Sequence, residues 1–195
     1  MYNLKAEYRD QNAKAKQLRR AGIVPACIYG VNLEESILLQ IPLADTIRFL
    51  NEKSKGNTLS IAVGRKKHNV LFKEITREPV SGQVEHLEFQ SLVSDEAINS
   101  VAQVVLINKD KNQNIIQQHI EEIPHTALPK HLVESVTIDL DGMPAGTTVK
   151  VEDLDIAKNK NVKLLIGEDT MVINIIDRSK TGPAVQEEPE AEAEE

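Results

Sequence analysis

Apolar residues alternate with polar ones in many short stretches of this chain. In the first ninety residues the stretches that predict strands are 4–9, 24–29, 36–41, 59–63, 70–72 and a last segment that ends near Phe89. Such alternation is typical of strands that bury one face. Because the stretches are short and closely spaced, they predict a small sheet that is closed or strongly curved. The strands 59–63 and 70–72 should form a hairpin with a basic tip at 64–68.

Two stretches of this half have helical spacing instead. Three apolar residues at helical intervals predict a helix over about 43–53. A shorter helix is expected between Asn12, which can accept the free N–H groups of a first turn, and Gly22, which tolerates a left-handed residue after the last turn. On this short helix one face presents cations and another packs: Lys16, Arg19 and Arg20 share the first, and Ala15, Leu18 and Ala21 share the second.

The second half is richer in strand patterns. Residues 101–107 and 115–120 are expected to pair as a hairpin across 109–112. Further alternating stretches are 136–140, 149–151, 162–166 and 171–175. The pattern predicts a mainly antiparallel β domain, and it places the whole chain in the class of mainly β proteins with short helices (α+β).

Charge divides the chain at about residue 90. Residues 1–90 hold 14 Lys and Arg against 10 Asp and Glu, residues 91–195 hold 9 against 20, and the net charge of −7 hides this division. We expect a basic domain at 1–90, an acidic β domain at 91–180 and a disordered acidic tail at 181–195. A polyanion such as RNA should meet the first domain and be repelled by the second.

Composition excludes several classes of protein. Aromatic residues make up only 3% of the chain, so the protein has few rings that could stack on unpaired bases. Cys27 is the one cysteine, so no intrachain disulfide can form and a reducing compartment is indicated. The first residues lack the apolar core of a signal peptide, and no run approaches a membrane span of roughly 18 residues. A soluble cytoplasmic protein is expected.

Signatures of catalysis and metal binding are missing. The chain has no G-x-S-x-G, Walker, G-x-G-x-x-G or H-E-x-x-H motif. The spacing of His119, His125 and His131 fits no standard zinc site and supports no hydrolase. The stretch 139–142 resembles the start of a calcium loop but lacks its later ligands, so a hairpin turn is expected. Cys27 is interpreted as a buried structural thiol. We expect no catalytic residue, metal, cofactor or small-molecule substrate.

Polar and basic residues gather again after the hairpin. Besides the helical cations and Lys14, the sequence offers Lys73, Thr76, Arg77, His86 and Glu88. On one strand His86 and Glu88 should share a face, with Leu87 and Phe89 on the opposite face. The basic helix alone would be interpreted as a solvated surface. Cations can neutralise phosphates, however, and when they lie beside hydrogen-bonding groups on a rigid sheet they are suited to binding a folded RNA helix.

The order and spacing of these residues resemble a known family. The motifs are Leu18-Arg19-Arg20-x-Gly22-x-Val24-Pro25-Ala26-x-Ile28-Tyr29-Gly30, then Lys73-Glu74-x-x-Arg77-x-Pro79-Val80, then His86-x-Glu88-Phe89. Residues 4–89 are similar to the bacterial large-subunit ribosomal protein family that binds 5S ribosomal RNA. The remainder resembles its longer form, the general stress protein CTC, in length, boundary and acidity.

The resemblance implies a six-stranded β-barrel with helices that docks on the loop E helix of 5S rRNA in the large ribosomal subunit. By position its RNA-binding residues would be Lys16, Arg19, Tyr29, Lys73, Thr76, His86 and Glu88. Lys14, Arg20 and Arg77 are added as candidate RNA contacts because they lie beside these residues in the sequence. Thr76 stands where the family usually has Gln, and Glu88 where it usually has Asp, which changes reach and donors. Alternatively, Tyr29 is a core residue whose hydroxyl reaches the surface, and His86 is an ordinary surface histidine.

A second hypothesis reverses the roles of the domains. The acidic β domain would then be the working part of a stress-related protein-interaction adaptor, because free strand edges can accept partner strands. Partners that survive nuclease treatment would favour that hypothesis. Under the first hypothesis the same domain reaches toward other ribosomal proteins.

Overall fold

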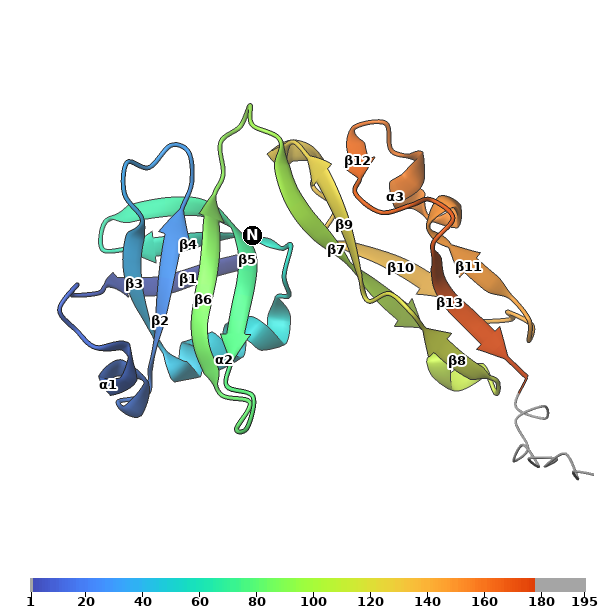
Figure 1. The fold of residues 1–195 in the computed structure, drawn as a ribbon, viewed down its shortest axis with the longest axis horizontal. Coiled ribbons are helices and arrows are strands. Elements are labelled where there is room, and N and C mark those ends of the chain that lie inside the picture. Colours follow the sequence, from blue (N-terminus) through green and yellow to red (C-terminus); the bar gives the residue numbers. More distant parts are fainter. Residues whose placement is uncertain (1, 178–195) are drawn as a thin grey trace, which may run out of the picture.

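The chain folds into two β units that follow one another in sequence (Figure 1). The structure is a computed structural model that describes residues 2–177 of the 195. The first unit ends with a strand at Ser91, and the second begins with a strand at Ile98. The expected tail at 181–195 lies outside the described residues.

The first unit is a closed barrel with two helices. Its elements are β1 (Tyr2–Tyr8), α1 (Ala15–Arg20), β2 (Ile23–Tyr29), β3 (Ile37–Pro42), α2 (Leu43–Glu52), β4 (Thr58–Val63), β5 (Lys66–Arg77) and β6 (Val84–Ser91). The strands follow the order β1-β3-β2-β6-β5-β4, and β4 pairs with β1 to close the ring. The pairs β1 with β4 and β2 with β6 run parallel, and the others are antiparallel. The expected six-stranded barrel is confirmed.

An aromatic cluster lies at the centre of the barrel core. Phe49 of α2 is fully buried, with its ring centroid 5.0 Å from that of Phe72 and 6.1 Å from that of Phe89. Aliphatic residues at alternate strand positions surround these rings. Because such a core is close-packed, it presents the outward side chains on a rigid frame.

The cap of α1 differs from the prediction. The helix begins after Lys14 rather than Asn12, and Lys14 makes no side-chain capping hydrogen bond. The backbone N–H of Asn12 instead donates to Oδ1 of Asp10 over 2.9 Å, because a short carboxylate readily closes a turn with the backbone two residues on. Gly22 ends the helix as expected, with φ at 73° and its N–H bound to the Arg19 carbonyl.

The second unit consists of two sheets around one core. Its strands are β7 (Ile98–Ile107), β8 (Ile115–Gln118), β9 (Glu122–Ala127), β10 (Ser135–Asp139), β11 (Thr148–Lys150), β12 (Val162–Leu164) and β13 (Met171–Ile176), and its helices are α3 (Asp155–Lys158) and the 3-10 turns η1 (Lys109–Lys111), η2 (Pro129–His131) and η3 (Val151–Asp153). The sheets have the orders β10-β7-β9-β12 and β11-β13-β8. Both contribute to one buried apolar cluster, so the predicted β domain is confirmed.

Strand pairing in this unit corrects two predictions. The hairpin of 101–107 with 115–120 is wrong, because β7 pairs with β9 and β10, whereas β8 pairs with β13 in the other sheet. The turn at 141–142 is not a hairpin turn either, since β10 pairs with β7 and β11 pairs with β13. Alternation determines which face of a strand is buried, but it does not select the partner strand.

Glu134 fastens the second unit to the barrel. Its Oε1 accepts hydrogen bonds from the Thr58 backbone N–H (3.0 Å) and Oγ1 (2.8 Å), and its Oε2 accepts one from Asn57 Nδ2 (3.2 Å). Lys53 Nζ lies 3.5 Å from Oε2. Burial alone would raise the pKa of Glu134, but the Thr58 hydrogen bonds and the Lys53 ammonium outweigh burial and lower the pKa. The carboxylate therefore stays charged at neutral pH.

Candidate nucleic-acid interface

Helix α1 presents cations to solvent beside β6. Leu18 is half-buried, whereas Lys16, Arg19 and Arg20 are exposed. Arg19 Nη2 lies 3.4 Å from Glu85 Oε1, and its Nη1 donates to the Glu85 carbonyl over 3.4 Å. Because these two side chains are 35% and 34% exposed, water screens the pair. The contact therefore orients Arg19 without neutralising the helix.

A polar hollow of about 410 Å³ lies between α1 and the turn end of the β5–β6 hairpin. Its lining residues are Lys16, Arg19, Arg20, Glu78, Gln83, Val84 and Glu85. Arg77 lines an adjoining, more apolar hollow together with Arg19, and its guanidinium donates to the Gly82 carbonyl over 3.2 Å. The helix cations and the hairpin thus form one concave surface, with Lys14 exposed where the helix begins.

Polar groups continue this surface along the outside of β5 and β6. Thr76 on β5 pairs with His86 on β6. Leu87 and Phe89 are fully buried, whereas the His86 and Glu88 side chains remain 30% and 36% exposed. The predicted division of this strand into a polar face and a core face is confirmed.

His86 is held in its neutral form. Burial is the main cause that lowers its pKa, and the nearby cations of Arg9 and Arg19 lower it further. The Glu88 carboxylate, 3.9 Å from Nδ1, opposes this effect without cancelling it. A neutral imidazole offers one donor and one acceptor, whereas an imidazolium only donates. His86 can therefore bind a donor and an acceptor at once.

Tyr29 and Cys27 stand on β2 next to the Glu88 carboxylate. Cys27 lies opposite Glu88 in the parallel pairing of β2 with β6. Burial first, and then Glu88, raises the pKa of Tyr29 and raises the pKa of Cys27 to about 11. Tyr29 is half-buried and keeps its proton, so it can donate. Cys27 is partly exposed rather than fully buried as expected, and its raised pKa makes it a poor nucleophile.

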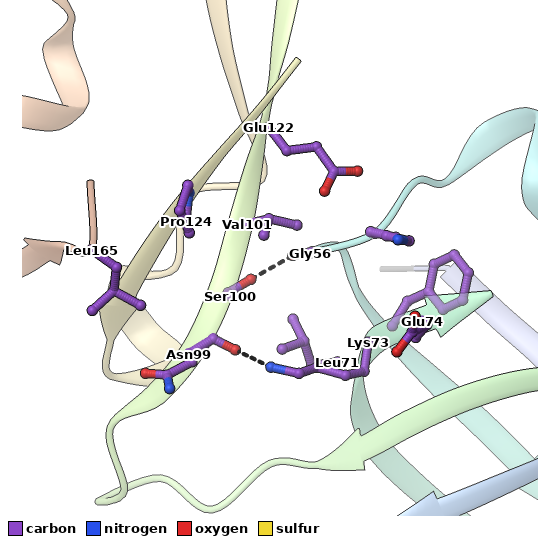
Figure 2. A pocket seen from close by; sticks show the side chains of 12 residues that line it. Gly56, Leu71, Lys73, Glu74, Asn99, Ser100, Val101, Glu122, Pro124 and Leu165 are labelled. Atoms are coloured by element: carbon purple, nitrogen blue, oxygen red, sulfur yellow. Dashed lines mark hydrogen bonds between the residues drawn. The ribbon is translucent and has the colours of Figure 1, made fainter. Parts of the chain in front are cut away.

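Lys73 lies at the junction of the two units, apart from α1. Its Nζ donates to the Asn99 carbonyl of β7 over 2.7 Å. Figure 2 shows this bond beside a hollow of about 250 Å³ whose walls come from both units. The pairing of β5 with β6 shifts between Phe72 and Glu74. Because such an irregularity re-aims a side chain, spacing in the sequence could not predict where Lys73 points.

Two residues of this surface were not predicted from the sequence. Glu85 orients Arg19, and it could have been found as the acidic neighbour of His86 on the same strand. Arg9 donates from Nη2 to the Ala13 carbonyl over 2.7 Å and so braces the loop before α1. Its charge also lowers the pKa of His86. No local signal links Arg9 to β6, because their proximity arises only when the barrel closes.

The histidines of the second unit form no site. His125 is fully buried, with Nδ1 3.3 Å from the Ile123 carbonyl, and burial lowers its pKa. Across residues 2–177 no group of three or more His, Cys, Asp or Glu is placed to hold a metal ion. No helix in the described part of the chain has the length and apolarity to cross a membrane.

Comparisons with known proteins match both units. The Ribosomal L25p family matches residues 4–89, and the family described as ribosomal protein TL5, C-terminal domain, matches residues 97–179. The large ribosomal subunit protein bL25 of Pseudomonas fluorescens is 32% identical, with 98% of each chain covered. Its namesake in Pseudomonas syringae pv. syringae is 30% identical over 100% of this chain and 97% of its own. That of Halothermothrix orenii is 29% identical over 100% of this chain and 89% of its own.

These similarities, together with the fold, show the class of protein: this is a structural ribosomal protein and not an enzyme. The sequence identity of 30–32% to the two Pseudomonas proteins extends over nearly the whole chain and is not confined to the barrel. The chain belongs to the ribosomal L25p family.

Proposed function

We propose that this protein is a constituent of the large ribosomal subunit and that its barrel binds 5S rRNA at the loop E helix. Relatives of comparable length are named large ribosomal subunit proteins, which supports the first part. The second part depends on one observation: α1, the β5–β6 hairpin and the polar face of β6 adjoin on one side of the barrel. As a ribosomal component the protein would work in the cytoplasm.

In this proposal the cations of α1 bind phosphates. Lys14, Lys16 and Arg20 are exposed, and within residues 2–177 none of them has an ion-pair partner. Contacts to phosphate fix the orientation of a protein on RNA and release counterions. With Arg19 they give about four contacts, so the logarithm of affinity should fall with the logarithm of salt at a slope of about −3 to −4.

The polar face would supply selectivity. Neutral His86 can donate and accept, the Glu88 carboxylate can accept from a 2′-hydroxyl or an amino group, and Thr76 and Tyr29 add hydroxyls. Recognition of a preformed helix is favoured over splayed bases, because Phe, Tyr and Trp make up only 3% of the chain. Lys73 is left out of the proposed contacts, since its ammonium is bound to Asn99.

Arg19→Ala tests the proposal in the full chain. The change removes a cation at the centre of the hollow and should weaken binding to purified 5S rRNA by about 1–2 kcal/mol, roughly 5- to 30-fold. Fluorescence anisotropy with labelled 5S rRNA measures the affinity. Arg48→Ala is the matched control, because Arg48 on α2 is 77% exposed, pairs only with Asp45 in the described residues, and lines neither hollow.

Two outcomes would count against the proposal. Equal affinity of the Arg19 and Arg48 variants would remove Arg19 from the site. If the wild-type chain binds an unrelated RNA duplex as tightly as 5S rRNA, the assignment of 5S rRNA is wrong. A footprint confined to the loop E helix is the expected result.

A further inference from the structure

Four exposed cations occupy the wall of the barrel formed by β1, β4 and β5. They are Lys5 on β1, Arg65 in the turn after β4, and Lys66 and Lys67 at the start of β5. In the part of the chain that the structure describes, none of the four forms an ion pair or a side-chain hydrogen bond. The one acid on β1, Glu7, accepts a hydrogen bond from Gln40 on β3 instead. This group of four is called the β1–β4 wall below.

Strand register places Lys5 and Lys67 together on the outer face, whereas Lys66 pairs with the buried Val63 at the end of the barrel. Lys67 pairs with Ala62 on β4, and on the other side of β4 Lys5 pairs with the same Ala62. Neighbouring strands lie about 4.8 Å apart, so the two lysine stems stand about 10 Å apart with a small side chain between them. The predicted hairpin of 59–63 with 70–72 is confirmed, but its turn is shorter than expected, and two of the tip cations belong to β5.

The β1–β4 wall lies opposite the proposed 5S rRNA site. In the barrel order, β2 and β6 are neighbours, and β1 and β4 are neighbours. One strand separates the two pairs in each direction, β3 on one side and β5 on the other. Lys5 on β1 is three strands from β6 in either direction, whereas Lys67 lies on β5 next to β6. A single straight RNA helix that lies against β6 therefore does not also cover Lys5.

The acidic second unit leaves the β1–β4 wall open. It attaches at Thr58, where β4 begins, and at Lys73, far along β5. Lys5 and Lys67 pair with Ala62 near the other end of β4, which is about 13 Å from Thr58 at the rise of an extended strand, and Arg65 lies in the turn after β4. Figure 1 shows the β4–β5 turn on the side of the barrel away from the second unit. At this separation, repulsion from the acidic unit is largely screened.

The chemistry of the wall favours a nucleic-acid backbone over a protein. Next to the cations, Asn3, Ser60 and Asn69 pair in a polar row across the same three strands. Among the exposed large apolar residues of the described chain, Tyr8 lies at the end of β1, where it pairs with Leu39 of β3, and none lies on β4 or β5. Protein interfaces depend on apolar or aromatic anchors at their centre, whereas phosphates are held by Lys, Arg and small polar groups.

We propose that the β1–β4 wall is a second nucleic-acid contact that binds the phosphate backbone of another RNA segment. This goes beyond the proposed 5S rRNA site, because it makes the barrel a bridge between two RNA backbones on opposite walls. The wall lacks the carboxylates that lie beside Arg19 and His86 on the α1 side. It should therefore bind with strong salt dependence and little sequence preference.

The test removes the α1 cations first and the β1–β4 wall second, both in the full chain. The probe is a fluorescently labelled RNA duplex of unrelated sequence, and the readout is anisotropy across a salt series. A background variant carries Lys16→Gln, Arg19→Gln and Arg20→Gln, and a second variant adds Lys5→Gln, Arg65→Gln, Lys66→Gln and Lys67→Gln. The background variant should retain duplex binding with a clear salt slope. Loss of the β1–β4 wall should weaken that binding roughly tenfold or more and flatten the slope by about 3.

A matched control separates position from net charge. It adds to the same background four exposed lysines of the second unit changed to Gln, namely Lys109, Lys130, Lys160 and Lys163. An equal loss in this control would overturn the proposal, as would an unchanged affinity when the β1–β4 wall is removed. Displacement of the duplex by polyglutamate at equal charge concentration would identify an acidic-protein surface and also overturn it. Circular dichroism checks that every variant is folded.

The outcome is independent of the proposed 5S rRNA site. The probe is not 5S rRNA, and the background already lacks the α1 cations. A failure of 5S rRNA binding would therefore leave this result standing, and a failure here would leave the 5S rRNA assignment standing.

Discussion

Removal of the Glu134 carboxylate should uncouple the barrel from the second unit. Thr58 donates two hydrogen bonds to Glu134, Asn57 donates one, and Lys53 forms an ion pair with it. Glu134→Ala deletes all of these contacts and leaves the Thr58 N–H without its acceptor. Glu134→Gln keeps the size and one acceptor oxygen but removes the charge.

The expected loss follows from the number and exposure of these contacts. The Glu134 side chain is 36% exposed, so water replaces part of what is lost. Hydrogen bonds to a charged group contribute about 1.5–3 kcal/mol each to stability when they are buried. Because water screens this site, we expect Glu134→Ala to lower the free energy of unfolding by about 2–3 kcal/mol in total. For Glu134→Gln we expect about 1 kcal/mol, because the geometry survives without the charge.

Tyrosine fluorescence can follow the barrel separately. The three tyrosines are Tyr2, Tyr8 and Tyr29, all in the barrel, and the chain has no Trp. Far-ultraviolet circular dichroism reports strands of both units. In a urea titration of the full chain, the fluorescence midpoint of Glu134→Ala should fall by about 1–2 M at an ordinary denaturant slope. The separation between the fluorescence and dichroism curves should widen.

Glu121→Ala is the control for a lost surface carboxylate. Glu121 is exposed, and its side chain has no hydrogen bond or ion pair within residues 2–177. If Glu134→Ala leaves the fluorescence midpoint unchanged, or if Glu121→Ala shifts it equally, the junction does not depend on Glu134.

Two further predictions concern the junction and the second core. A Cβ at Gly56, where φ is 83°, would lie 1.8 Å from the Val101 carbonyl oxygen, whereas a Cβ at Gly64 would meet nothing within 4 Å. Gly56→Ala should therefore lower the free energy of unfolding far more than Gly64→Ala, which costs only about 1–2 kcal/mol of left-handed strain. Equal losses of unfolding free energy in urea denaturation would contradict this close approach. Burial lowers the pKa of His125, so the unfolded chain binds a proton first and the free energy of unfolding should decrease as pH falls below about 6.5. His125→Leu should flatten this part of the profile of urea midpoint against pH, and an unchanged profile would assign the dependence to other groups.

The sequence predicted the parts of the barrel that depend on local patterns. His86 and Glu88 face outward while Leu87 and Phe89 are buried, as alternation along one strand requires. The helix predicted over about 43–53 is α2, Leu43–Glu52, because its apolar residues recur at helical intervals. In both cases the pattern lies within one element, so no knowledge of the neighbouring elements was needed.

The sequence did not predict which strands are partners or where a strand is irregular. Residues 115–120 were assigned to the nearest alternating strand, but β8 pairs with β13, far along the chain. The alternation of apolar and polar residues in 115–120 is equally compatible with pairing to either strand. Lys73 was grouped with Thr76 and Arg77 by proximity in sequence, yet the register shift next to it directs its ammonium to Asn99. Irregularities of this kind have no clear sequence signal.

The arrangement of acids within the barrel distinguishes its two basic walls. On the α1 side, Glu85 orients Arg19 and Glu88 lies beside His86, so cations alternate with acceptors at defined positions. Such a mixed surface penalises a misaligned RNA, because a carboxylate brought against a phosphate costs free energy. On the β1–β4 wall no acid is paired beside Lys67, and the Glu7 carboxylate of β1 is bound to Gln40, so this wall rewards any phosphate. Selectivity should therefore reside on the α1 side, and the β1–β4 wall should add affinity without changing which RNA is chosen.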